Sequence, residues 1–283
     1  MIQLILTDIA RYIDFLRSSG YAVSVCCFDT VFSPCLDMLC QYEIHPLAIC
    51  DYWKSNPATE GLCSKNKRRL LRRQNVQLFY SCCYAGVEEY VVPVRQEGRT
   101  ILCVNVSGYR GSVPRSEKTR KIMQRRYGLQ EEFQQMYAAL SLNLPDQERI
   151  LAITSPLSYM FRQLYQACSR IEISDSETAA LYHRILRKIC DEYMNPITAE
   201  NIAAELHYSA SYIRALFKKK SGRSIHAYLN EVRLRQAASL LTGSSFPVTQ
   251  IAHTTGFGDS NYFSTAFKAR FGSSPQQYRK ERQ

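Results

Sequence analysis

The chain opens with apolar side chains at helical spacing and then changes to short strand-like runs. The first pattern predicts a helix over residues 2–19, ended by Gly20. Its apolar positions are Ile2, Ile5, Ile9, Ile13 and Leu16. The run YAVSVCCF that follows predicts a strand, and residues 34–42 form a looser helical pattern.

Three β-branched and aromatic runs, VQLFYSCCY, EEYVVPV and RTILCVNV, lie between residues 76 and 106. Turns at Gly86 and at residues 96–98 separate them. A helix, a strand, further helices and three strands predict a small α+β domain that ends near Gly111. Helical periodicity returns over residues 116–190, with expected breaks near Pro145 and Pro156 and a last helix over residues 174–193.

The last third contains an internal repeat. LFKKKSGRSIHAYL, from Leu216, superposes on AFKARFGSSPQQYR, from Ala266, at an offset of fifty residues. Each copy has the order helix, tight turn, helix and glycine: IAAEL, HYSA and SYIRALFKKK in the first, TQIAHTT, GFGD and NYFSTAFKARF in the second. One such pair could be a plain helical hairpin, but two basic copies favour two helix-turn-helix units.

The residue types in the repeat match the needs of that motif. Ser209 and Asp259 are placed as N-caps of the second helices, and Gly222 and Gly272 suit their C-termini. Gly256 supplies a left-handed turn conformation. Small alanines, Ala203 and Ala252, let the helices cross closely. The expected buried stripes are Ile213, Leu216 and Phe217 in one copy and Phe263, Ala266 and Phe267 in the other.

The outward faces of the two second helices carry the candidate DNA contacts. These residues are Ser209, Ser211, Arg214, Lys218, Lys219, Ser260, Asn261, Ser264, Thr265 and Lys268. Arginine can bond guanine and asparagine can bond adenine with two hydrogen bonds each. The lysines and Arg270 lie further along and are expected to hold phosphates. Ala210 and Ala215 leave Arg214 as the main base reader of the first copy.

Charge supports this interpretation. The formal net charge is +11, and the residues from 195 to the end hold twelve Lys/Arg and five Asp/Glu. An excess in the last third favours a polyanionic partner, although a simply basic surface is the alternative. A second basic run, KNKRRLLRR at residues 65–73, is either a solvated helix face or an auxiliary phosphate contact.

The stretch VTQIAHTTGFGDSNYFSTAFKARFGSSPQQYR resembles the signature of AraC/XylS-type transcription regulators, and the likeness extends over residues 186–280. It implies an all-α DNA-binding domain, assigned to residues 184–283, whose two recognition helices enter successive major-groove segments about 34 Å apart. It also implies double-stranded promoter DNA and RNA polymerase as partners and a bacterial activator as the kind of protein. A homodimer through the first domain or residues 116–190 is a further hypothesis.

Residues 61–111 resemble the PocR-type sensory domain, a PAS-like ligand-binding module, with Cys63, Cys83 and Glu89 on its pattern. The sensor is assigned to residues 1–165, and residues 166–183 to a helical connector. Tyr84 stands where the pattern has histidine. A tyrosine can keep a hydrogen bond at this position but is a poor metal ligand. The resemblance implies a small organic effector, with Cys63, Cys83, Tyr84 and Glu89 as candidate ligand-binding residues.

The eleven cysteines show no paired C-x₂-C spacing, and no histidine clusters with them. They are interpreted as buried thiols, with a ligand pocket or a redox or metal switch as alternatives. No leader pattern or apolar run of about 20 residues is found, so a cytoplasmic protein with reduced thiols is expected. No catalytic motif, metal site or cofactor is expected. The predicted function is effector-controlled, sequence-specific transcription regulation; the alternative is a thiol- or metal-responsive regulator.

Overall fold

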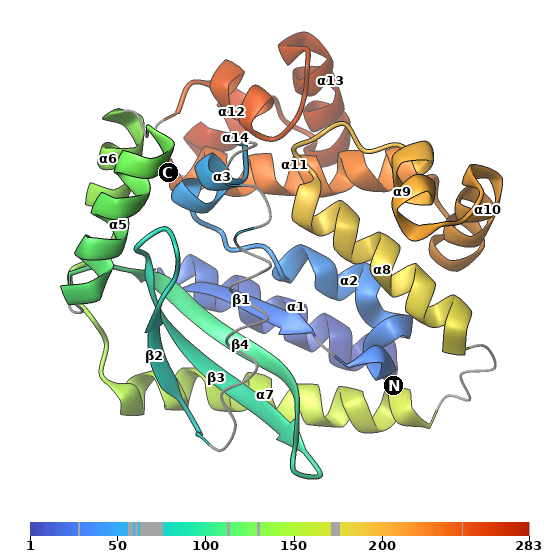
Figure 1. Ribbon diagram of the computed structural model, residues 1–283, viewed down its shortest axis with the longest axis horizontal. Coiled ribbons are helices and arrows are strands. Elements are labelled where there is room, and N and C mark those ends of the chain that lie inside the picture. Colours follow the sequence, from blue (N-terminus) through green and yellow to red (C-terminus); the bar gives the residue numbers. More distant parts are fainter. Residues whose placement is uncertain are drawn as a thin grey trace. The chain divides into compact units, whose positions relative to one another are not determined.

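The computed structural model divides the chain into two compact units (Figure 1). Unit 1 consists of Met1–His45 and Ala58–Ser174, and unit 2 of Pro46–Pro57 and Asp175–Gln283. The structure describes residues 1–27, 29–55, 59, 62, 76–111, 114–128, 131–170, 176–244 and 246–282. The basic run at residues 65–73 and the candidate ligand residue Cys63 lie outside these described residues.

An antiparallel four-stranded sheet is the centre of unit 1. Its strands are β1 (Ala22–Cys27), β2 (Phe79–Cys82), β3 (Glu88–Gln96) and β4 (Arg99–Tyr109), in the order β1-β4-β3-β2. The turn between β3 and β4 has positive φ at both Glu97 and Gly98, which matches the right-handed twist of a tight hairpin. All four predicted strands are confirmed.

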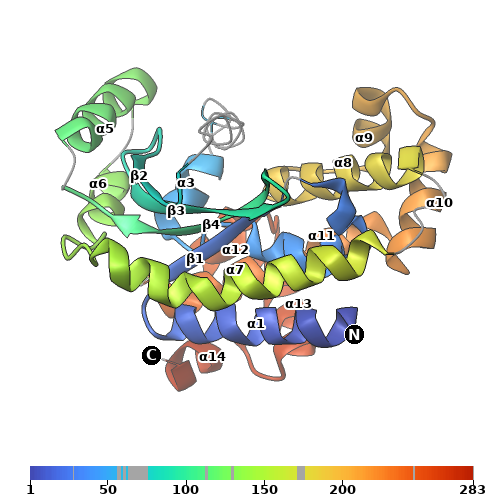
Figure 2. The same cartoon turned by 90° about the horizontal axis from the view of Figure 1, so that it is seen from below.

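Two long helices, α1 (Ile2–Ser18) and α7 (Gln147–Ser169), lie side by side on one face of the sheet (Figure 2). The buried side chains of α1 are Leu6, Ile9, Ile13 and Leu16, the predicted helical stripe. The sheet contributes four fully buried valines, Val23, Val25, Val104 and Val106. The alternation of strand side chains places these valines on one face of the sheet, so that face is apolar.

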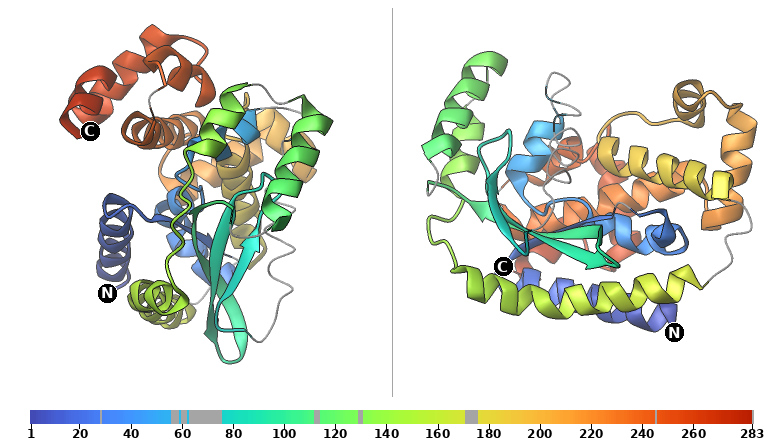
Figure 3. Two further views of the ribbon diagram at one scale, coloured as in Figure 1. Left: turned by 90° about the vertical axis from the view of Figure 1, so that its left-hand side faces the viewer. Right: turned by 60° about the horizontal axis from the view of Figure 1, so that its bottom comes forward.

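The predicted break at Pro156 is wrong, because α7 runs through it as one helix (Figure 3). Proline removes one helical hydrogen bond and frees the carbonyl four residues earlier, that of Ala152. Both Pro156 and Ala152 are exposed, so water can bond the freed carbonyl. The hydroxyl of Tyr12, from α1, also donates to the Ile153 carbonyl at 3.1 Å. The predicted break near Pro145 is confirmed, since α7 begins at Gln147.

Shorter elements complete unit 1. They are η1 (Thr30–Cys35), α2 (Leu36–Leu39), η2 (Cys40–Tyr42), α5 (Pro114–Tyr127) and α6 (Glu131–Ala138). The first three confirm the looser helical pattern predicted around residues 34–42. Phe32 of η1 packs edge-on against Phe161 and Tyr165 of α7, which fixes this segment to the long helix.

Unit 2 is entirely helical in its described residues. Its elements are α3 (Ala48–Ser55), α8 (Ser176–Glu192), α9 (Ala199–Leu206), α10 (Ala210–Ser221), α11 (Ile225–Gly243), α12 (Val248–Thr254), α13 (Ser260–Phe271) and α14 (Pro275–Arg282). The sequence patterns gave no helix at α3, and its assignment to this unit joins residues 46–57 to the C-terminal third. Among the described residues of the chain, no helix is both long and apolar enough to cross a membrane.

Candidate nucleic-acid interface

The first helix-turn-helix consists of α9 and α10. Ser209 caps α10, because its side chain accepts a hydrogen bond from the Tyr212 amide at 3.2 Å. Gly222 ends the helix in the left-handed conformation at φ 71°. His207 ends α9, also left-handed at φ 62°, and the Tyr208 amide donates back to the Ala203 carbonyl. The turn is therefore closed by backbone bonds as well as by the cap.

The second helix-turn-helix, α12 and α13, repeats this construction with one extra turn residue. Gly256 takes the place of His207 at φ 88°, and the Phe257 amide donates to the Ala252 carbonyl at 2.9 Å. Asp259 caps α13 through the amides of Asn261 and Tyr262, at 2.6 and 2.9 Å. An acidic cap at a helix N-terminus also interacts favourably with the helix dipole. The predicted caps, glycine stops and glycine turn are all confirmed.

Buried aromatic side chains fix each second helix on its unit. Phe217 of α10 is fully buried and meets Tyr228 edge-on at 5.4 Å between ring centroids. Phe267 of α13 repeats this contact with Tyr278 at 5.2 Å. Ile213, Leu216 and Phe263 are buried as predicted, while Ala266 is only half-buried. The stripes leave the opposite helix faces to solvent.

The predicted DNA contacts lie on those outer faces. Exposed residues are Ser209, Ser211, Arg214, Lys218 and Lys219 on the first copy and Asn261, Thr265 and Lys268 on the second. Ser260 and Ser264 are half-buried. The hydroxyls of Ser264 and Thr265 donate to helix carbonyls four residues earlier, at 2.8 and 3.0 Å. Their oxygens keep the capacity to accept, so the face offers acceptors near its start and cations further along.

Two predicted cations have protein partners that the sequence patterns did not indicate. The Arg214 guanidinium pairs with the Glu200 carboxylate on α9, and both side chains are more than half exposed. Arg270 donates to both oxygens of Glu231 on α11, at 2.8 and 2.9 Å, and Arg235 pairs with the same carboxylate. Arg270 thus fixes α13 to α11, and its charge is less available to a phosphate than Lys268 is.

Exposed tyrosines are a feature that sequence reasoning missed. Tyr212 and Tyr262 stand at equivalent positions on α10 and α13, 43% and 52% exposed. Tyr212 stacks on Tyr208, and Tyr262 accepts a hydrogen bond from the Asn230 side chain at 3.0 Å. Their equal place in the two copies was a signal available from the repeat, and phenol hydroxyls commonly bond DNA phosphates.

A hub of backbone contacts joins the two helix-turn-helix units. The Arg233 guanidinium, on α11, donates to the carbonyls of Tyr193 and Asn195 at 2.7 and 2.8 Å. These residues lie between α8 and α9, at the entrance to the first copy. A Cβ built on Gly256, in the turn of the second copy, would meet the Met194 carbonyl at 2.7 Å. Burial lowers the pKa of Arg233, but it stays charged.

Three of the candidate effector residues lie in the described part of unit 1. Cys83 and Tyr84 are half-buried in the turn between β2 and β3, and Glu89 is buried inside β3. Glu89 lies opposite Ser107 in the register, on the sheet face that α1 and α7 do not cover, and His45 is 4.0 Å from its carboxylate. Glu89 also lies opposite Ser81 of β2, the strand that leads into the turn with Cys83 and Tyr84.

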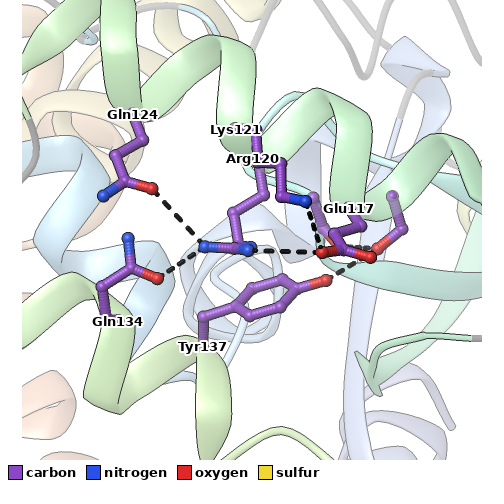
Figure 4. Close-up of polar contacts among 8 residues, drawn as sticks. Glu117, Arg120, Lys121, Gln124, Gln134 and Tyr137 are labelled. Atoms are coloured by element: carbon purple, nitrogen blue, oxygen red, sulfur yellow. Dashed lines mark hydrogen bonds and ion pairs between the residues drawn. The ribbon is translucent and has the colours of Figure 1, made fainter.

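The turn itself is held by a polar cluster from α5 and α6 (Figure 4). The Ser116 hydroxyl bonds the Gly86 carbonyl and the Tyr137 hydroxyl at 2.7 and 2.9 Å. The Arg120 guanidinium lies over the Tyr137 ring at 4.9 Å and donates to the Gln134 side-chain oxygen at 2.5 Å. A Cβ on Gly86 would come within 3.0 Å of the Ser116 carbonyl, so this position requires glycine. These contacts give the turn at Gly86 a structural role for its conformation.

Comparisons with known proteins agree with the C-terminal geometry. A family described as "Helix-turn-helix domain" matches residues 202–281. The Msm operon regulatory protein of Streptococcus mutans is 36% identical over 113 residues, 40% of this chain and 41% of its own length. The HTH-type transcriptional activator RhaS of Klebsiella pneumoniae is 34% identical over 125 residues, 44% of this chain and 45% of its own. These findings confirm a helix-turn-helix domain in the C-terminal third of the chain.

Among solved structures, the C-terminal domain of AraT, a response regulator from Geobacillus stearothermophilus, is similar to this chain at 33% sequence identity. That likeness covers 38% of this chain and 88% of AraT's domain, with a TM-score of 0.36. The chain spans less than half the length of the two curated relatives named above.

Proposed function

We propose that the protein is a sequence-specific DNA-binding transcription regulator that uses α10 and α13 as recognition helices. The observation that carries this proposal is the pair of capped helices whose buried faces repeat and whose free faces are polar and basic. Asn261, exposed at the start of α13, is suited to adenine, and Arg214 to guanine. The matching relatives are regulators by name, which supports the same function.

The test is a binding assay on duplexes selected from a random library by the full chain. Affinity should fall steeply with salt, because each phosphate contact releases counterions. Asn261→Ala should relax sequence preference at one position by roughly 1–3 kcal/mol, whereas Lys268→Ala should weaken binding to all duplexes alike. Equal losses on every sequence for Asn261→Ala would reassign that residue to phosphate contact.

The regulator is proposed to respond to a small organic effector in a PAS-like, PocR-type domain within residues 1–165. Support comes from the sheet face opposite α1 and α7. Ser24 and Asn105 stand directly opposite each other in the register, and both are almost fully buried. Their Ser24 Oγ and Asn105 Oδ1 atoms have no hydrogen-bond partner among the residues that the structure describes. A neutral molecule with hydroxyl or amide groups would satisfy both.

A thermal-shift screen of small diols, hydroxy acids and amides tests this part of the proposal. A compound that stabilises the wild-type chain should lose its effect in Asn105→Leu and Ser24→Val. Ser158→Ala, which removes a hydroxyl that bonds the Thr154 carbonyl of its own helix, is the matched control and should keep the effect. Full stabilisation of both sheet variants would place the effector elsewhere, with the turn residues Cys83 and Tyr84 as the next candidates.

The remaining expectations complete the proposal. Residues 184–283 form the DNA-binding domain and residues 166–183 the connector, although α3 also belongs to the compact C-terminal unit. The protein is proposed to act in the cytoplasm, to contact RNA polymerase as an activator, and to form a homodimer. Analytical ultracentrifugation with and without the selected duplex tests the last point, and a strict monomer in both would contradict it.

A thiol-responsive regulator is the second candidate, favoured by one observation. The sulfurs of Cys35, in η1, and Cys168, near the end of α7, are 3.2 Å apart and fully buried. A hydrogen bond between them lowers the pKa of Cys168. A peroxide could take two electrons and two protons from the pair, forming the S–S bond of about 2.05 Å and releasing water. Peptide mapping after peroxide treatment, with Cys35→Ser as control, decides whether this disulfide forms.

A further inference from the structure

Helix α3 is held inside unit 2 by a buried polar contact. The Tyr193 hydroxyl donates to the Asp51 carboxylate at 2.5 Å, across 142 residues of sequence. Asp51 is 1% exposed and Tyr193 is fully buried. Burial raises the pKa of Tyr193, and the Asp51 carboxylate raises it further. Breaking such a contact leaves a buried polar group without its partner, so the pair holds α3 firmly.

Apolar packing adds to that contact. Ala48, at the start of α3, packs against the core of the second helix-turn-helix, which includes Ile251, Ala252 and Phe263. Helix α3 lies against α12, the first helix of that copy. Trp53, the only tryptophan of the chain, is fully buried on α3. The helix therefore touches the second copy on one side and reaches the entrance of the first copy through Tyr193.

These contacts place α3 at the hub where the two copies are set against each other. Tyr193 is the residue whose carbonyl Arg233 holds, and the next carbonyl, that of Met194, lies against Gly256. The segment that holds α3, residues 46–57, is preceded and followed in the sequence by residues of unit 1. The chain thus connects α3 to unit 1 on both sides.

We propose that α3 is the element through which unit 1 controls DNA binding. Docked through Asp51 and Tyr193, it holds the two recognition helices at the spacing that successive major-groove segments require. When α3 is withdrawn, each helix-turn-helix stays folded, but the position of one relative to the other is no longer fixed. An effector that binds unit 1 differently in the two states shifts their populations. This inference rests on the proposed DNA-binding function and adds its mode of regulation.

The experiment measures spacing discrimination in the full-length chain. Wild-type protein selects a duplex from a random library, and two base pairs are then inserted between its half-sites. The wild type should lose affinity for the lengthened duplex. The fold-loss of affinity in Asp51→Ala and Tyr193→Phe should be roughly ten times smaller, which is within the range of ordinary allosteric coupling. Trp53 emission should shift to longer wavelength in both variants, because α3 leaves its buried site.

Two further variants separate this role from simple destabilisation. Lys188→Met removes a cation that pairs with Glu192 and Glu205 at 2.7 and 2.5 Å, on α8 and α9. It should lower the stability of unit 2 but keep both the spacing discrimination and the Trp53 emission. Asp51→Asn retains an oxygen for the Tyr193 hydroxyl and should lie between wild type and Asp51→Ala, which covers the case of an Asp51→Ala chain that does not fold.

The outcomes are distinct. If the wild type selects no duplex, the DNA-binding function itself is wrong. If the wild type selects a duplex and the two variants keep wild-type discrimination, α3 has no part in setting the recognition helices. Unchanged Trp53 emission in the variants would equally overturn the inference, because the Asp51–Tyr193 contact would not be what holds α3.

Discussion

Substitution of Gly256 by alanine tests the packing at the turn of the second helix-turn-helix. Gly256 has φ 88°, a conformation that costs a residue with a side chain about 1 kcal/mol. The added Cβ would also lie 2.7 Å from the Met194 carbonyl oxygen and 2.9 Å from Arg233 Nε. Backbone must move to relieve such a contact, and overpacking of this kind costs roughly 1–3 kcal/mol. The expected total loss is about 2–4 kcal/mol.

Gly272→Ala is the matched control, because Gly272 has nearly the same φ of 82° but nothing within 4 Å of an added Cβ. Its expected cost is the conformational part alone, about 1 kcal/mol. Urea unfolding followed by Trp53 emission reports the stability of unit 2 for both variants. His207 shows that the equivalent turn in the first copy accepts a side chain at φ 62°, so the difference must come from the hub. Equal losses for the two variants would refute this account.

Other perturbations test the helix caps, an exposed ion pair and a buried histidine of unit 2. Asp259→Ala should destabilise unit 2 by about 1–2 kcal/mol because two amides lose their cap, and Ser209→Ala by less, since it caps one; urea unfolding measures both. Glu200→Gln should strengthen DNA binding by a few-fold, because it releases Arg214 from an exposed pair worth less than about 1 kcal/mol; unchanged affinity would mean that Arg214 does not contact DNA. Burial, with a smaller effect of a nearby arginine, lowers the pKa of His183 to about 4. The unfolded chain therefore binds a proton more readily, and the free energy of unfolding should fall by about 3 kcal/mol between pH 6.5 and pH 4. His183→Gln should lose that pH dependence, and an unchanged pH profile in this variant would contradict the prediction.

The repeat in the last third could be predicted because its information is local. Caps, glycine stops and the buried aromatic stripe each act within one turn of a helix, and the second copy confirms the first. The sequence predicts an N-cap at Asp259 and a left-handed turn at Gly256, and the structure confirms both. The buried stripes also identify the solvent-facing sides of the two second helices, because these are the faces that the stripes leave.

Long-range contacts could not be predicted in this way. Helix α3 has eight residues, too few for a clear apolar period, and Asp51 meets Tyr193 only through the fold. The Cys35–Cys168 pair, 133 residues apart, is equally invisible in one sequence. The break predicted at Pro156 is wrong for a different reason. The local rule predicts a break, but Pro156 and Ala152 are exposed, so water can bond the carbonyl that the proline frees.

Hydroxyl-radical footprinting of the full-length chain on its selected duplex tests the central claim most directly. Two helix-turn-helix copies should protect two segments on one face of the duplex, about one helical turn or 10–10.5 base pairs apart. Asn261→Ala should weaken protection of one segment and leave the other. A single protected segment, or uniform loss of protection in Asn261→Ala, would contradict the assignment of α10 and α13 as a pair of recognition helices.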